Sequence, residues 1–351
     1  MATISSVDAR ARFTKMLFDV YQERIRPTDF LRSFFKVSMS GASNVAVEVE
    51  RMGEKIAVDV YRGTEGNRKK FSKTTEKIWT PPMYAEIFDI TQLDLYDRVL
   101  GSQGNANENL FASLLNTAAD RMGLLQDTIE RALELQCSEV LTSGEVTLNA
   151  STNINYARRA ASIVDDGSGQ YFASAIDPFA KFKAGCDFLR QYGHSTDSTF
   201  VAILGETALK DLLANSTFTA RQNYFNMALD QVTGPRRNAK GAAFHGIITA
   251  GSYKVELWTY PQIYDAADGT KTKYIDDKKV ILIPQNPRFF MAHALVPQLI
   301  SAPGQQVTQA AWVYDEKTDP WKTSHEYRVR TCALAVPVAV DQIYTFRAVA
   351  A

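Results

Sequence analysis

The chain has 351 residues, of which 45% are hydrophobic and 11% aromatic, so it can bury a core and is unlike a disordered protein. Lys and Arg together number 39, as do Asp and Glu, and this balance argues against a dedicated nucleic-acid binder. No apolar run reaches the length of a membrane span, and the polar N-terminus is unlike a secretory signal.

The first 40 residues predict an arm. Two short apolar groups share this segment, and Pro27 separates them. They are Phe13, Met16, Leu17 and Tyr21, which follow helical spacing, and Phe30, Leu31, Phe34 and Phe35. Neither group has apolar neighbours of its own. We therefore expect Phe13, Leu17, Phe30 and Phe34 to dock on the rest of the chain or on another copy of it.

Residues 44–80 predict long extended strands around a charged tip. Val45, Val47 and Val49 alternate with other residues, and the pattern resumes after a turn at Met52-Gly53. A period of two is typical of strands. The tip carries the basic residues Arg62, Arg68, Lys69, Lys70 and Lys73. Two interpretations stay open, namely a solvated surface hairpin and a projecting arm that needs a partner surface.

The longest regular pattern covers residues 107–142. Its apolar residues recur at steps of three and four, which predicts a helix roughly 50 Å long that ends before Gly144. The positions between them predict a polar face that includes Asp127, Glu134 and Gln136. The stripe lacks a strict heptad, and Gly123 lies inside it. We therefore expect a spine that carries a sheet or an elongated domain, and not a coiled coil.

The remaining elements mix helices and strands without regular alternation, which favours an α+β fold. Helices are expected at 178–192 and 206–213, and strands at 145–148, 199–204, 244–248, 255–258, 280–283, 312–314, 327–336 and 343–349.

No constellation of residues predicts catalysis. The four histidines lack metal-ligand spacing, and neither a nucleophile elbow nor a phosphate-binding glycine loop is present. Cys137, Cys186 and Cys332 are isolated and odd in number, which indicates buried free thiols. We predict no catalytic residue, no cofactor and no metal site.

The segment Trp258–Pro284 resembles a signature of the tailed-phage major capsid protein E family, the lambda-type capsid proteins. Trp258, Tyr260 and Tyr264 precede an acidic-glycine turn at Asp268-Gly269, and a tyrosine and an apolar strand follow it. This arrangement predicts an aromatic hairpin.

Other pieces are similar to the same family and occur in the same order. They are Pro81-Pro82 after a charged extended loop, the spine helix running into Gly144 and a strand, and Asp177-Pro178 opening a helix. The resemblance covers residue 45 to the end of the chain.

The resemblance implies the Hong Kong 97-type phage capsid fold, an α+β fold. Residues 1–44 would be the N-terminal arm and residues 45–80 the E-loop. Residues 81–176 and 297–351 would form the peripheral domain with the spine helix, and residues 177–296 the axial domain. The apolar stripe of the spine would pack on C-terminal strands at 329–340 and not on another helix.

The function that the resemblance implies is that of the major capsid protein of a tailed double-stranded DNA bacteriophage. Copies of the chain would form hexamers and pentamers of an icosahedral head shell, with the E-loop tip on an adjacent subunit. Other expected partners are a portal protein at one vertex, decoration and scaffolding proteins, and packaged double-stranded DNA, bound non-specifically on the inner face. Some relatives begin with a scaffolding segment. The short arm here departs from that pattern and favours a separate scaffolding protein or none. The protein would assemble in the host bacterial cytoplasm and reside in the virion, without a membrane.

Three alternatives stay open from the residues alone. One is an encapsulin-like shell that stores a cargo enzyme, and another is a minor decoration protein. The third is an enzyme of unknown type, against which the missing catalytic constellation counts.

Overall fold

The computed structural model describes residues 26–49, 75–91, 106–148, 152–165, 171–173, 176–225, 236–237, 240–266, 268–297, 310–319 and 324–349. The α-helices are α3 (Ala106–Thr142), α4 (Pro178–Gln191), α5 (Glu206–Ala214) and α6 (Ser216–Phe225), and the 3-10 helices are η1 (Arg32–Phe34), η2 (Ala160–Ser162) and η3 (Val340–Gln342).

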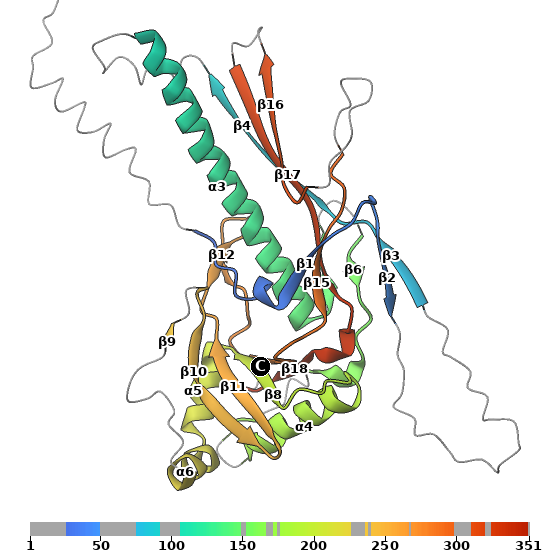
Figure 1. Ribbon diagram of the computed structural model, residues 1–351. Coiled ribbons are helices and arrows are strands. Elements are labelled where there is room, and N and C mark those ends of the chain that lie inside the picture. The colour runs from blue at the N-terminus through green and yellow to red at the C-terminus, as the bar shows by residue number, and fades with distance from the viewer. Residues whose placement is uncertain are drawn as a thin grey trace, which may run out of the picture.

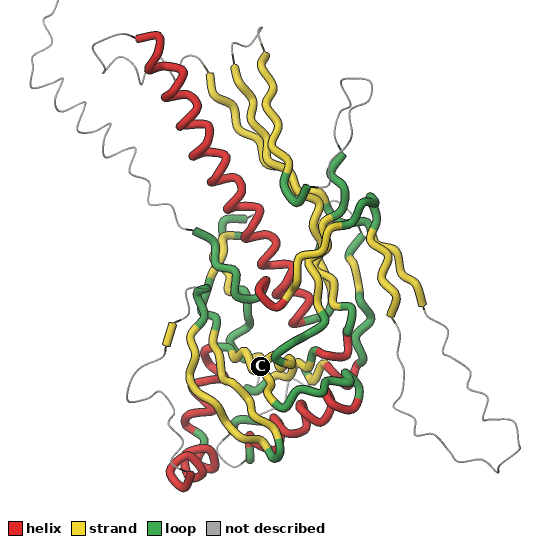
Figure 2. Tube along the Cα trace, in the orientation of Figure 1, coloured by secondary structure: helices red, strands yellow, loops and turns green. Residues whose placement is uncertain are grey.

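Within the described ranges, the strands fall into two larger sheets and three small ribbons. They are β1 (Phe35–Met39), β2 (Val45–Val49), β3 (Thr75–Trp79), β4 (Met83–Thr91), β5 (Glu145–Val146), β6 (Ile154–Asn155), β7 (Ile163–Val164), β8 (Thr199–Leu204), β9 (Arg236–Arg237), β10 (Ala243–Ala250), β11 (Tyr253–Thr259), β12 (Ile263–Asp265), β13 (Lys271–Lys273), β14 (Lys279–Pro284), β15 (Phe289–His293), β16 (Val313–Asp319), β17 (Ser324–Pro337) and β18 (Tyr344–Arg347). Helices and strands are mixed as predicted, which confirms the α+β class (Figure 2).

The upper part of the molecule is a wedge built on α3 (Figure 1). In one sheet β17 pairs with β16 and β4 along its first half and with β15 along its second half, and β1 pairs in parallel with β15. The long helix lies along this sheet.

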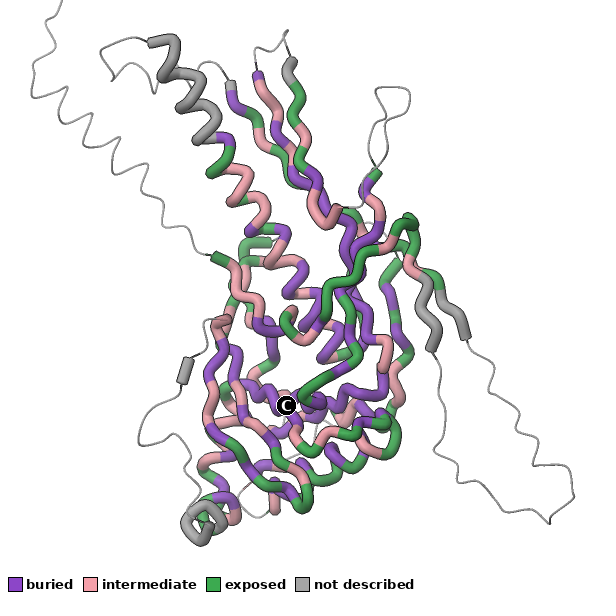
Figure 3. Tube along the Cα trace, viewed as in Figure 1, coloured by how far each residue is buried: buried purple, intermediate pink, exposed green. Residues whose placement is uncertain are grey.

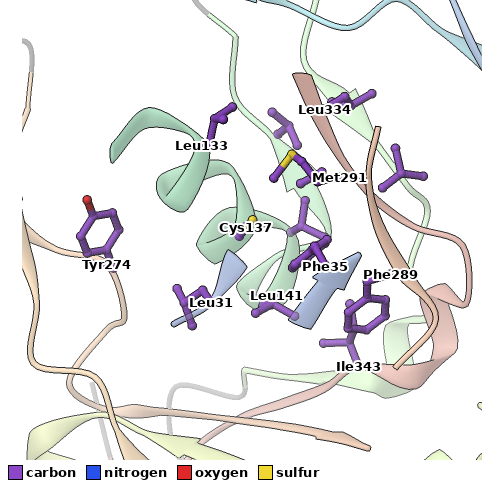
Figure 4. Packing of buried hydrophobic residues seen from close by; sticks show 14 of the residues in the cluster. Leu31, Phe35, Leu133, Cys137, Leu141, Tyr274, Phe289, Met291, Leu334 and Ile343 are labelled. Carbon is purple, nitrogen blue, oxygen red and sulfur yellow. The ribbon is translucent and has the colours of Figure 1, made fainter. Parts of the chain in front are cut away.

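The apolar stripe of α3 packs on strands, as expected. Leu133, Cys137 and Leu141 are fully buried and share one core cluster with Val329 and Leu334 of β17. Figure 4 shows these helix residues facing the strands and Leu31 of the N-terminal segment.

The polar face expected on α3 is wrong at three positions. Asp127, Glu134 and Gln136 are buried. Gln136 donates to the Tyr84 hydroxyl on β4 at 2.6 Å and accepts from the Ala335 amide on β17 at 3.2 Å. Neighbouring elements thus cover a side of the helix that periodicity alone assigns to solvent.

The lower part of the molecule is a sheet in the order β7-β18-β14-β8-β11-β10-β9. Ile203 and Ile281 belong to the core beneath α3, whereas Ala202 and Leu282 belong to the core under α4 and α5. Because side chains alternate along a strand, β8 and β14 are apolar on both faces. This explains why both read as continuous apolar runs.

Two local predictions are confirmed at single residues. Asp177 caps α4 by accepting from the Phe179 amide at 3.0 Å, with Pro178 in the first turn. The turn of the aromatic hairpin forms between β12 and β13, where the Ala266 amide donates to the Thr270 carbonyl at 2.8 Å and Gly269 adopts a φ of 81°. The hairpin is shorter than predicted, because Trp258 lies on β11 and the apolar strand that follows the turn is β14, both in another sheet.

The strand pairings join segments that the predicted domain boundaries separate. β1, from the predicted arm, and β15, from the predicted axial domain, lie in the sheet of β17. β7 and β18, from the predicted peripheral domain, lie in the sheet of β8. The division into domains stays a prediction.

Candidate functional site

The predicted contact residues fall into two groups. Arg62, Arg68, Lys69, Lys70 and Lys73 of the E-loop tip, and Phe13 and Leu17 of the arm, lie outside the described residues, so their contacts stay predictions. Phe30 and Phe34 are described.

The ribbon at the base of the predicted E-loop is anchored to the body. β2 and β3 form an antiparallel ribbon in which Val45 faces Trp79. The Trp79 ring lies 4.9 Å from the Tyr156 ring, edge to face, and the Tyr156 hydroxyl donates to the Ala335 carbonyl of β17 at 2.7 Å. The ribbon therefore leaves the body from a fixed point beside β17 (Figure 1).

Phe30 and Phe34 lie in the predicted arm, and the structure brings Phe30 against two aromatic residues that stand just before the aromatic hairpin. The Phe30 ring is buried, with its centroid 5.5 Å from Trp258, 5.6 Å from Tyr260 and 5.3 Å from Phe34. Offset and edge contacts at these distances are favourable aromatic geometries.

Glu134 of α3 is the polar centre of this junction, although the helical period predicts it on the solvent face. Its Oε1 accepts from the Leu31 amide at 2.8 Å and from the Tyr260 hydroxyl at 2.9 Å, and its Oε2 accepts from the Arg32 amide at 3.0 Å. Burial raises the pKa of Glu134, and these three hydrogen bonds act against that shift. A signal existed in the sequence, because Glu134 stands beside Leu133 and three residues before Cys137, both apolar positions of the stripe.

Large apolar side chains are exposed on the wedge. Val37 on β1 is 65% exposed and Ile87 on β4 is 56% exposed, and Met39, Ile78 and Met83 are also exposed. In the described part of the chain, β1 ends one side of its sheet. Figure 3 shows the exposed stretches along β1 and β4.

The described residues offer little for catalysis. They hold no group of three His, Cys, Asp or Glu side chains placed to bind a metal ion. The three cysteines are buried free thiols, and burial raises the pKa of Cys186 to about 12, which disfavours a reactive thiolate. Among the described helices, none combines the length and the apolar character that crossing a bilayer requires.

Comparison with known proteins gives one family. The family described as phage major capsid protein E matches residues 14–341. No curated protein matches the chain by sequence.

Solved structures share the architecture. A protein described as a prophage capsid protein of Escherichia coli CFT073 is similar at a TM-score of 0.59 and 13% identity, over 96% of this chain and 98% of that one. A protein of Microbacterium phage Oxtober96 is similar at a TM-score of 0.50 and 12% identity, over 99% of both chains. The capsid protein of cyanophage P-SCSP1u is similar at a TM-score of 0.50 and 9% identity, over 94% of this chain and 93% of that one. At such low identity these likenesses show the fold, and they confirm the predicted phage-capsid architecture.

Proposed function

This chain belongs to the phage major capsid protein E family, and we propose on that premise that its copies form the hexamers and pentamers of an icosahedral head shell. The family match over nearly the whole chain carries the proposal. The protein is thus a structural component of a bacteriophage capsid, and its work is self-assembly.

The E-loop supplies one of the subunit contacts. Its base is held by Trp79 on Tyr156, so its direction is set by the body of its own subunit. We propose that Arg62, Arg68, Lys69, Lys70 and Lys73 meet carboxylates on the adjacent subunit. Exposed ion pairs are individually weak, so several basic residues acting together suit a contact that must form in slightly different settings.

The exposed apolar residues of the wedge supply a second contact. Val37, Met39, Met83 and Ile87 stand on β1 and β4. Exposed apolar surface and open strand edges are usually covered by a partner. In a closed shell that partner is another copy of the chain.

Other partners follow from the role of a head shell. The balanced charge suits a wall around double-stranded DNA that touches the genome non-specifically and weakly. A portal protein at one vertex, and decoration or scaffolding proteins, complete the set, and assembly takes place in the host bacterial cytoplasm. We keep the division into arm (1–44), E-loop (45–80), peripheral domain (81–176 and 297–351) and axial domain (177–296) as part of the proposal.

Electron microscopy of the expressed full chain tests this function. We expect closed shells with hexameric and pentameric capsomers, and particles from infected cells should contain double-stranded DNA. Particles that instead enclose a cargo enzyme and no DNA would indicate a storage compartment. A protein that stays monomeric at high concentration, with and without co-expressed scaffolding protein, would contradict the proposal.

A further inference from the structure

The aromatic hairpin region and the foot of the arm form one joint. Phe30 packs on Trp258 and Tyr260, which stand just before the hairpin. The Tyr260 hydroxyl also lies 2.5 Å from the Thr28 hydroxyl, so residues 28–30 contact this region through both rings and hydroxyls. Thr28 is two residues from Arg26, where the described part of the chain begins.

Glu134 ties the same segment to the spine helix. Its two carboxylate oxygens accept from the amides of Leu31 and Arg32 and from the Tyr260 hydroxyl. The Arg32 guanidinium lies 3.2 Å from Glu130, one turn earlier on α3. One buried side chain therefore joins three parts of the chain that are more than 100 residues apart in sequence.

The arrangement needs a carboxylate and not merely a polar side chain. Both oxygens of Glu134 face backbone N–H donors. An ionised carboxylate accepts at both oxygens, whereas an amide accepts at one end and donates at the other. A glutamine here would place its NH2 group against either the Leu31 or the Arg32 amide, and one buried donor would lose its acceptor.

The joint lies directly before the first strand of the wedge. Leu31 and Arg32 lead directly into η1 and β1, and β1 then pairs with β15. On the other side, residues 1–25 of the predicted arm precede Thr28 in sequence. Holding Leu31 and Arg32 thus sets the start of β1 and the position of the segment that follows these residues.

We propose that Glu134, with Tyr260, is a latch that positions the N-terminal arm for contact with neighbouring copies during shell assembly. Glu134 is a positioning residue, because it acts through the backbone of Leu31 and Arg32. The inference rests on the proposed function, because the arm can contact neighbouring copies only if the chain assembles into a shell.

The test compares Glu134→Gln with a matched control on the same helix, Glu139→Gln. Glu139 also accepts from a backbone amide, that of Thr147, at 2.9 Å, but it lies away from the arm. Hydrogen exchange is measured on dissociated full-length subunits, and shells are counted by electron microscopy. Tyr260→Phe, which keeps the ring against Phe30 and removes the hydroxyl, is a second variant should Glu134→Gln fail to fold.

We expect exchange at Leu31 and Arg32 to rise at least tenfold in Glu134→Gln, with the rest of the subunit unchanged and the yield of closed shells reduced. Glu139→Gln should match the wild type in both measurements. Unchanged exchange at Leu31 and Arg32, a uniform rise over the whole subunit, or normal shells despite faster local exchange would each overturn the latch. If the wild-type chain formed no shells, the proposed function would be refuted. Because hydrogen exchange is measured on free subunits, it would still show whether Glu134 holds Leu31 and Arg32.

Discussion

Single polar side chains decide how the elements of this molecule meet. Glu134 and Gln136 sit within an otherwise apolar core, and each binds donors or acceptors from other elements. An unsatisfied buried polar group costs about 1–3 kcal/mol, so such residues tolerate one arrangement of their neighbours and reject others. They add specificity to a core that apolar residues alone would build less uniquely.

Asp165 shows how charge acts at the scale of one residue. It accepts from Arg347 of β18 and lies 3.1 Å from Lys279 of β14. The hydrogen bond from Arg347 is the largest cause that lowers the pKa of Asp165, from 3.8 to about 2.

We predict that Asp165→Asn lowers the free energy of unfolding at neutral pH by less than about 1 kcal/mol, because the pair is partly exposed. A depressed carboxyl pKa stabilises the folded chain at pH above the ordinary value of 3.8, and this stabilisation is lost as the pH falls to about 2. Urea unfolding of both proteins over this range should show the difference vanishing in acid. A difference that grew toward low pH would contradict the assignment.

Among the elements, the base of the predicted E-loop and the outer strands are the ones that we propose for subunit contact. A two-stranded ribbon is marginally stable by itself. The β2–β3 ribbon gains its support at Trp79, through Tyr156 and β17. The elements that reach outward are thus fixed where they meet the body.

Deleting residues 62–70 should abolish shell formation and leave a folded subunit. The deletion removes four of the five predicted basic contact residues but keeps the anchored strands β2 and β3. Sedimentation and microscopy would report the loss of shells, and circular dichroism would report the fold. Shells of normal shape from the deleted chain would contradict the role of the tip.

Ile87→Asp should reduce assembly without destabilising the subunit. Side chains alternate along β4, so exposed Ile87 points away from the face where Phe88 and Ile90 pack near α3. A charge buried in a subunit contact is costly, whereas the same charge on a free surface is tolerated. We expect at least a tenfold lower yield of shells and an unchanged unfolding midpoint. Ile87→Val, which keeps an apolar surface, is the control. Normal assembly of Ile87→Asp would show that this face of β4 takes no part in a subunit contact.

At the scale of the whole molecule, the end of α3 connects the two sheets. Arg158 donates to the carbonyls of Leu141 and Thr142 at the end of the helix, both at 3.2 Å. It also donates to the Ile343 carbonyl and the Thr345 hydroxyl at 3.1 Å, beside and within β18. One partly buried arginine thus connects the spine to the lower sheet.

Arg158→Met should lower the free energy of unfolding by about 3 kcal/mol or more, because the carbonyls of Thr142, Ser162 and Ile343 lose the Arg158 donor at once. Arg328→Ala is the control. Arg328 lies 3.0 Å from Asp315, both side chains are partly exposed, and Asp315 keeps its ion pair with Arg330, so the loss should cost less than about 1 kcal/mol. Chemical denaturation of the two variants gives the comparison. Equal losses would show that Arg158 does not hold the spine.

The sequence by itself determined the elements whose signals are local. The spine was predicted at 107–142 and is α3, Ala106–Thr142, because an uninterrupted apolar period needs no tertiary information. The cap at Asp177 and the turn at Gly269 were readable for the same reason, since each depends on neighbours along the chain. The resemblance of the Trp258–Pro284 segment supplied the family.

Only the tertiary structure decided what lies next to what. Strand β1 was missed because its partner, β15, lies more than 250 residues away in sequence and most of its side chains are exposed. Glu134 was assigned to solvent because a charged residue on an amphipathic helix is usually exposed, and its buried donors come from residues 31, 32 and 260. Periodicity records the average environment along one element, whereas burial of a charge depends on donors that distant segments bring to it.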